Sequence, residues 1–472
     1  MSFRIAPVAV LSAVLAVVPC TGRADPPPRG SPFSEWFKSV QVKSGPSSGE
    51  LPHTLDGAVS GYLDGRVADA EAVVKSLATE KPKDESYPLY QLTLGSISLC
   101  QGDYQAVQRS LTAALERMGA KLSTTATGLA FINAETKRPY RGFPYEKMLA
   151  HTYLGLAFMQ QSRSEDARIE FAQAREAQRG SAAGQEDDFA TGHFLEGLNF
   201  LHRKEYNDAQ VSFRKVTELH KEWPLGWFAL CRASDLAHDA GEAGEAWSHY
   251  EALAPAGARL ARDGSTPCVL FLVESGRGPH RWASGHDAQG ARDPKAGASN
   301  SNDNSKVDLT LAEWKPTDSP EIRVSIACSD TAKVEAPKLD DLYFQASTSG
   351  GIVGEATRKL VGGLIHSFFS GDKSSKDGSK NNDKNKDQSK DQNKDDENVD
   401  LRSWGTTPGA LHLAAVPVPA VPTTIETTCS DKSGNNIESL RRVMRFLRGQ
   451  PFERAPIVYE RIPPNAASRA GG

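Results

Sequence analysis

The chain has 472 residues, enough for two or three domains with sizeable hydrophobic cores. Its 55 lysines and arginines nearly balance its 59 aspartates and glutamates, and no basic stripe interrupts that balance. This composition excludes a nucleic-acid-binding surface of the usual kind, which would show clustered positive charge.

The first 24 residues have the features of an export signal. Arg4 supplies a short positive region, and residues 5–18 form an almost unbroken apolar run. A run of that length is typical of a signal peptide and too short to span a bilayer. Small residues lead up to Ala24, so we predict cleavage after Ala24 by a signal peptidase.

A lipid anchor at Cys20 is the alternative form of export. Pro19 precedes this cysteine, where a lipoprotein signal usually carries a small residue, so soluble export is favoured. No later segment is long and apolar enough to cross a membrane. The expected location is therefore the periplasm or cell envelope, with lipid anchoring through Cys20 as the disfavoured alternative.

A Pro/Gly/Ser-rich linker over 25–50 precedes a segment with an internal repeat. Two copies of one pattern lie 42 residues apart, between Tyr145 and Val216. In each copy an aromatic residue and an alanine follow a glycine by three and twelve positions, and a phenylalanine follows the alanine by four. The members are Gly155, Phe158, Ala167 and Phe171 in the first copy, and Gly197, Phe200, Ala209 and Phe213 in the second. Small residues let two antiparallel helices approach closely while the rings fill the space between them, so we interpret all eight as packing residues.

Weaker copies flank these two, around Gly95, around Ala246 and, in degenerate form, around Gly65. The pattern resembles the tetratricopeptide repeat family, from which Glu196 departs at a usually apolar position. The resemblance implies four or five helix pairs over 51–255 and a concave surface that binds protein or peptide segments. Specificity would then lie in variable positions such as His151, His193 and Glu196, or in the long inter-repeat loops.

Helical periodicity stops near Ala254, and strand-like runs follow. They bound a predicted β-rich domain over 256–369 and 401–472. Its predicted strands are 268–273, 321–328, 342–344, 411–418, 424–429 and 457–462. Prolines in and after 411–418 predict edge or irregular strands there.

Other segments of this half are expected to be helical or unstructured. A flexible loop is predicted over 283–307, a packed helix over 355–369 and a short helix over 437–447. Residues 370–400 mix lysine, aspartate, asparagine and serine almost without apolar residues, which predicts a disordered polyampholyte insertion. The predicted fold class is α+β, with an N-terminal helical solenoid and a smaller β-rich C-terminal domain.

Five cysteines would remain after signal cleavage. Cys100 and Cys231 lie in predicted helices and are interpreted as small buried hydrophobes. In an exported protein one disulfide is plausible among Cys268, Cys328 and Cys429, and Cys328–Cys429 is our choice. Spacing alone does not determine the connectivity.

Four short motifs along the mature chain carry a second resemblance. They are Gly102-Asp103-Tyr104, Tyr145-Glu146-Lys147-Met148-Leu149, Val273-Glu274-x-Gly276-x2-Pro279 and Asp400-Leu401-Arg402-Ser403-Trp404-x3-Pro408. The chain is similar to a family of exported, often lipid-anchored bacterial envelope proteins with tetratricopeptide-like N-terminal halves. The resemblance implies an envelope location and a scaffold role, and it carries no catalytic residues. For the last motif we predict a structural role, in which Arg402 pairs with Asp400 or Glu274 beneath Trp404.

A search for catalytic or cofactor motifs assigns no catalytic, cofactor-binding or metal-binding residue. The eleven histidines are scattered, and the sequence has no C-x-x-C pair, P-loop or dinucleotide fingerprint. Glu274 and His280 follow a predicted buried strand and could form an acid/base pair, although solvated surface residues are the more common outcome. No cofactor is therefore expected.

Two functional hypotheses follow. The first is a non-enzymatic interaction protein of the envelope that binds a protein or peptide partner through its helical repeats. The second is an envelope enzyme whose C-terminal domain acts on a wall or polysaccharide substrate. Close carboxylates in a C-terminal cleft would favour the enzyme.

Overall fold

The computed structural model describes most of both predicted halves. The signal segment, nearly all of the linker, most of the 283–307 loop, the 355–369 helix and almost all of the 370–400 insertion lie outside the described residues. Those described are 49–119, 139–179, 188–283, 312–315, 322–328, 333–349, 400–419, 421, 423–431, 433–437 and 442–463.

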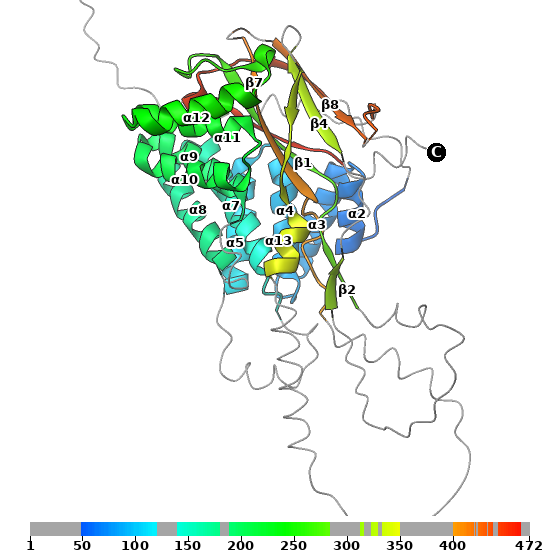
Figure 1. Cartoon of the computed structure of the whole chain (residues 1–472). Coiled ribbons are helices and arrows are strands. Elements are labelled where there is room, and N and C mark those ends of the chain that lie inside the picture. The colour runs from blue at the N-terminus through cyan, green and yellow to red at the C-terminus, as the bar shows by residue number, and fades with distance from the viewer. Residues whose placement is uncertain are drawn as a thin grey trace, which may run out of the picture.

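Five antiparallel helix pairs form the N-terminal solenoid within the described residues (Figure 1). This confirms the predicted helical repeat architecture. The pairs are α2 (Leu55–Leu63) with α3 (Val67–Glu80), α4 (Tyr87–Cys100) with α5 (Tyr104–Gly119), α7 (Pro144–Gln160) with α8 (Ser164–Arg179), α9 (Ala190–Arg203) with α10 (Tyr206–Leu219), and α11 (Pro224–Leu236) with α12 (Ala240–Leu253).

The turn inside each pair has the same backbone geometry. One residue there adopts a positive φ, which ends the first helix and reverses the chain. Only the first two pairs use glycine at this point, and the other three bear the modest cost of a side chain in the left-handed region. The five residues are Gly65, Gly102, Ser162, Lys204 and His238.

The repeat glycines allow the two helices of a pair to touch. A Cβ placed on Gly155 would lie 2.7 Å from the Phe171 ring, and one on Gly197 would lie 2.6 Å from the Phe213 ring. Gly95 meets Leu111 in the same way in the second helix pair. The packing interpretation of the repeat is confirmed.

Replacing Gly155 with alanine should destabilise the protein by about 1–3 kcal/mol, because the new methyl group overlaps the Phe171 ring in a closely packed core. Gly244 in α12 provides a matched control, since a Cβ there meets nothing within 4 Å. Gly244→Ala should stabilise by about 0.5–1 kcal/mol through helix propensity. Urea denaturation followed by circular dichroism measures both changes, and equal effects of the two substitutions would contradict the close-approach interpretation.

Three sheets form the described part of the C-terminal region. The first has the order β10-β1-β7-β6, the second β5-β4-β8-β9, and β2 pairs with β3 in a short ribbon. Strand β10 runs parallel to β1, and the other pairings are antiparallel. The strands are β1 (Cys268–Ser275), β2 (His280–Ala283), β3 (Ala312–Lys315), β4 (Arg323–Cys328), β5 (Val334–Ala336), β6 (Lys338–Asp341), β7 (Ala410–Pro417), β8 (Thr423–Ser430), β9 (Arg442–Leu447) and β10 (Ile457–Arg461).

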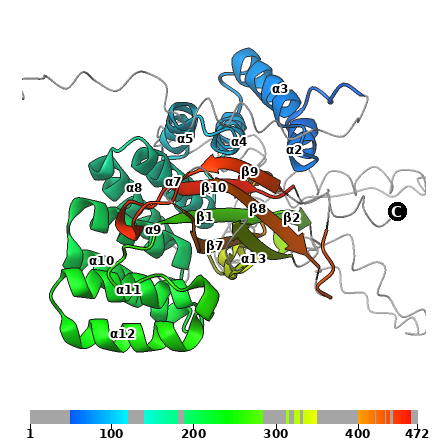
Figure 2. The ribbon, with the colours of Figure 1, turned by 90° about the horizontal axis from the view of Figure 1, so that it is seen from above.

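The first sheet lies between the solenoid and the second sheet. Along β1, Leu270 and Leu272 belong to the core shared with the helices, whereas Val269, Phe271 and Val273 belong to the core shared with the second sheet. Both faces of β1 are therefore buried, which explains its continuous apolar run. Viewed from above, the helices curve around the first sheet, which occupies the concave side of the solenoid (Figure 2).

Several C-terminal predictions were wrong. Residues 342–344 begin helix α13 (Leu342–Ser349) instead of forming a strand, and the predicted 437–447 helix contains strand β9. Of the predicted edge or irregular strands, the edge is wrong, because β7 lies between β1 and β6, but the β6–β7 and β8–β9 pairings do contain irregularities. Residue 283 of the predicted loop belongs to β2. The predicted strands 268–273, 321–328, 411–418, 424–429 and 457–462 correspond to β1, β4, β7, β8 and β10.

The Cys328–Cys429 disulfide is also wrong. None of the five cysteines from Cys100 onward, all of which are described, forms a disulfide. Cys429 pairs with Val324 in the β4–β8 ladder, and Cys328 lies four residues further along β4. Four residues of strand separate the two cysteines by about 13 Å, well beyond disulfide reach.

None of the helices in the described ranges combines the length and the apolar character needed to cross a bilayer.

Candidate functional site

The concave side of the solenoid is the place where a repeat protein of this kind would be expected to hold a peptide. Here the chain's own first sheet and its connecting segments fill that side. Gln160 of α7 donates to the carbonyl oxygen of Ile457 in β10 at 2.8 Å, and the Thr406 hydroxyl donates to Ser96 of α4 at 2.8 Å. The expectation that the concave surface is open to a partner is therefore wrong for the described part of the chain.

A buried ion pair lies at the centre of the joint between the solenoid and the first sheet. Arg461 of β10 lies 2.8 Å from the carboxylate of Glu274 at the end of β1, and both side chains are almost completely buried. The Tyr153 hydroxyl of α7 donates to the other carboxylate oxygen. Nη2 of Arg461 donates to the carbonyl oxygens of Gly276 at 2.9 Å and Thr407 at 3.4 Å. Glu274 is thus a structural anchor and neither the solvated residue nor the acid/base partner of His280 that the sequence suggested.

Three tyrosines enclose this pair. Burial raises the pKa of Tyr62, Tyr153 and Tyr459 well above the ordinary value near 10, so all three remain protonated. The Tyr62 hydroxyl lies 3.1 Å from the Cys100 sulfur, and the Arg461 guanidinium lies over the Tyr62 ring. Burial likewise raises the pKa of Cys100 to about 12, which keeps its thiol protonated and unreactive.

A second buried carboxylate joins the two halves further along the concave side. Glu146 of α7 accepts from the backbone N–H of Trp404 at 2.6 Å and from that of Phe143 at 2.9 Å. Tyr140 donates to it as well. Burial raises the pKa of Glu146, against the opposing effect of these donors. Trp404 is completely buried here and meets the Tyr153 ring edge-on.

The Asp400–Arg402 part of this motif forms the predicted pair. Arg402 Nε lies 2.8 Å from Asp400, and the same carboxylate accepts from the Arg402 backbone N–H. The pair holds the turn that presents Trp404 to α7. This confirms the structural role predicted for the motif, with Asp400 rather than Glu274 as the partner of Arg402.

Two further contacts connect the halves at the other end of the solenoid. Asp340 of β6 accepts from the backbone N–H groups of Ala190 and Thr191, at 3.0 and 2.8 Å, and so caps the N-terminus of α9. Arg232 of α11 donates to Glu453 at 2.7 Å, in the single turn η5 (Phe452–Arg454) before β10.

Replacing Arg461 with methionine should lower the free energy of unfolding by about 3–5 kcal/mol, because the Glu274 carboxylate would stay buried without its cation. Arg168→Met is the matched control, since it removes an exposed pair with Glu165 and should change stability by less than about 1 kcal/mol. The double variant Glu274→Gln/Arg461→Met should lose less than the sum of its single variants. Urea denaturation measures all four, and additive single losses would contradict direct coupling.

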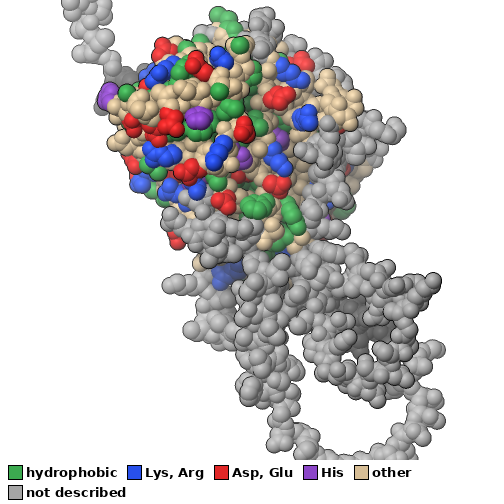
Figure 3. All heavy atoms as spheres, viewed as in Figure 1, with side chains coloured by type: hydrophobic (Ala, Val, Ile, Leu, Met, Phe, Trp, Pro, Cys, Tyr) green, Lys and Arg blue, Asp and Glu red, His purple; other side chains and the backbone are tan. Residues whose placement is uncertain are grey.

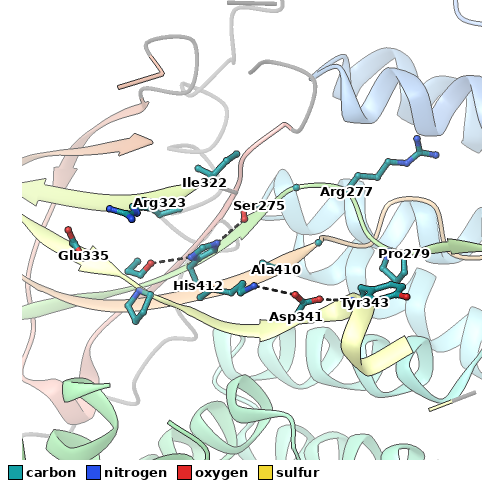
Figure 4. A pocket seen from close by; sticks show the side chains of 16 residues that line it. Ser275, Arg277, Pro279, Ile322, Arg323, Glu335, Asp341, Tyr343, Ala410 and His412 are labelled. Atoms are coloured by element: carbon teal, nitrogen blue, oxygen red, sulfur yellow. Dashed lines mark hydrogen bonds and ion pairs between the residues drawn. The ribbon is translucent and has the colours of Figure 1, made fainter. Parts of the chain in front are cut away.

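A cavity of about 390 Å³ opens between the two larger sheets (Figure 4). Ser275 and His412 point toward each other on its wall, with the hydroxyl 2.8 Å from His412 Nε2. His412 Nδ1 lies 3.1 Å from the carbonyl oxygen of Ala336. A carbonyl oxygen only accepts, so Nδ1 carries the proton and Nε2 accepts from Ser275.

This pair has the tautomer that a general base needs, but its surroundings favour a structural role. Ser275 and His412 are both buried, and burial lowers the pKa of His412 to about 4, which makes it a weak base. Asp341, on the same wall, accepts from the Tyr343 backbone N–H at 3.0 Å and pairs with Lys338 at 3.2 Å. Among the described residues that line it, the cavity thus shows no pair of close, unengaged carboxylates of the kind that would favour a polysaccharide-cleaving enzyme.

Lowering the pH from about 6.5 to 4 should destabilise the parent protein relative to a His412→Gln variant. The unfolded histidine binds a proton below about 6.5, whereas the folded one stays neutral down to about 4, so the unfolded state binds more protons in this window. Above pH 6.5 the histidine is neutral in both states and the free energy of unfolding is unaffected. By pH 4 protonation of the unfolded histidine lowers the free energy of unfolding by about 3 kcal/mol. Urea denaturation of both proteins at several pH values measures the difference, and parallel curves would contradict a buried neutral His412.

The repeat positions proposed from sequence to carry specificity are mostly internal. His193 and Glu196 are buried, and Glu196 pairs with Arg175 at 2.8 Å. His151 is half-buried, with Nδ1 2.7 Å from Glu170. In the described ranges no three His, Cys, Asp or Glu side chains form a group that could hold a metal ion.

The chain matches no protein-family model, and no curated protein matches it in sequence. Solved structures of two proteins resemble part of this chain. A crystal structure of MamA covers 41% of this chain and 92% of its own, at 13% identity and a TM-score of 0.31. The match with MamA from Desulfovibrio magneticus RS-1 covers 47% of this chain and 96% of the MamA chain, at 13% identity and a TM-score of 0.31. The match with YrrB, described as a TPR protein with an unusual peptide-binding site, covers 48% of this chain and 94% of the YrrB chain. The identity is 12% and the TM-score is 0.33.

Proposed function

We propose that this protein is a non-enzymatic interaction protein of the bacterial cell envelope, and that it binds a protein partner through the outer face of its helical repeats. The envelope location rests on the signal-like segment 1–24 and on the resemblance of the four short motifs to envelope proteins. The outer face is proposed because the concave side is filled by the chain's own sheet.

One observation carries the choice of the outer face. Ile169 of α8 and Val211 of α10 each follow the repeat alanine by two positions, and they are 45% and 61% exposed. The two strongest repeats therefore present a large apolar side chain to solvent at the same repeat position. Burial of these two side chains against a partner would remove apolar surface from water, which favours association.

A photo-crosslinking amino acid at position 169 or 211 of the full-length protein, expressed in its envelope context, should join the protein to the same discrete partner. Position 421 provides a control, since Val421 is 63% exposed but lies in the C-terminal region. Mass spectrometry of the crosslinked species identifies the products. The proposal fails if positions 169 and 211 yield no product, or if position 421 yields the same one.

The second candidate function is an envelope hydrolase, and the Ser275–His412 pair beside an open cavity is the observation in its favour. A fluorophosphonate probe distinguishes the two candidates because it labels only activated serines. Labelling that Ser275→Ala abolishes would select the enzyme, and a parent protein that stays unlabelled would select the interaction protein.

A further inference from the structure

A groove of about 580 Å³ lies at the end of the solenoid. Its sides are the outer helices α10 and α12, and residues of α11 form its floor. Its volume falls in the range of about 300–1,000 Å³ that is typical of ligand-binding pockets. We call it the terminal groove. Figure 3 shows charged side chains of both signs, with hydrophobic atoms between them, over the α10–α12 end of the visible face.

A half-buried tryptophan on the floor is held in one orientation. The Trp227 ring stacks on His249, with 4.1 Å between ring centroids and 18° between their planes. Its Nε1 donates to the carbonyl oxygen of Lys221 at 2.7 Å. The indole therefore has its hydrogen bond satisfied and its plane fixed, so a ligand would pay little conformational entropy to order it.

The charge of the groove is negative. Four glutamates but only two basic residues line it. Arg214 and Glu242 neutralise each other at 2.7 Å, and this pair also ties α10 to α12. Glu218 lies 3.9 Å from Lys215, which is outside the lining. Glu222, Glu245 and Lys221 form no ion pair within the described residues, so an excess of negative charge is available to a ligand.

We propose that the terminal groove binds a segment of a partner protein that carries lysine or arginine side chains next to an apolar residue. The proposal rests on the function proposed above and names the chemistry of the partner. Glu222 and Glu245 attract the cationic side chains, Trp227 offers an aromatic surface to a cation or an apolar side chain, and Leu230 lies on the floor between the helices.

The test uses full-length protein and a fluorescently labelled decapeptide of alternating lysine and leucine. Fluorescence anisotropy should show saturable binding that weakens as ionic strength rises, because surface charges are screened by salt. A peptide with glutamate in place of lysine should not bind. Glu222→Gln/Glu245→Gln should reduce affinity about fivefold to tenfold, and Trp227→Ala should reduce it about tenfold.

The control variant is Glu116→Gln/Glu251→Gln, which removes two exposed glutamates outside the groove, one of them on α12 itself. Its affinity should equal that of the parent. Equal affinity of the groove variant and the control would overturn the proposal, as would binding of the glutamate peptide. Self-association that the groove variant abolishes, measured by sedimentation velocity, would overturn it in favour of a second copy of this chain.

Failure of this inference can be told apart from failure of the proposed function. If positions 169 and 211 crosslink to a partner and the groove variants retain that crosslink, the interaction function stands without the terminal groove. If neither position crosslinks while the lysine peptide binds the groove specifically, the groove stands without the outer-face proposal.

Discussion

The joint between the two halves depends on one buried ion pair, Glu274 with Arg461. Two charges removed from water are stable only when each is paired and hydrogen-bonded, and here β1, β10 and α7 must all be in place to supply those partners. The pair therefore has strict geometric requirements. It makes the solenoid and the first sheet one cooperative structure, in agreement with the hydrophobic core that the helices share with β1, β7 and β10.

The same constraint explains most of the four short motifs singled out in the sequence. They are far apart in the sequence, but three of them meet at this joint. Glu146 accepts from the Trp404 backbone, Tyr153 contacts both the Trp404 ring and Glu274, and Arg461 donates to Gly276. Their residues hold the sheet on the concave side of the helices. The inner face of the solenoid is thus used for stability, while side chains of the outer helices such as Ile169 and Val211 remain exposed.

The errors in the C-terminal half share a physical cause. Residues 342–344 are apolar, like a short strand, but Asp341 caps the backbone N–H groups of Tyr343 and Phe344 and starts a helix there. Strand β9 has a pattern that fits a helix, and it becomes a strand because it pairs with β8. Local pattern is ambiguous for short apolar runs, and the neighbouring strand or cap decides between the two forms.

The sequence alone determined the helix pairs, because Gly155 with Phe171 and Gly197 with Phe213 are local packing partners whose spacing is visible in the chain. It also determined β1, whose apolar run is long enough to be unambiguous. Only the tertiary structure decided that the concave face is filled and that Glu274 is buried. Those features depend on contacts between residues up to about three hundred positions apart, such as Gln160 with Ile457, and no local spacing records them.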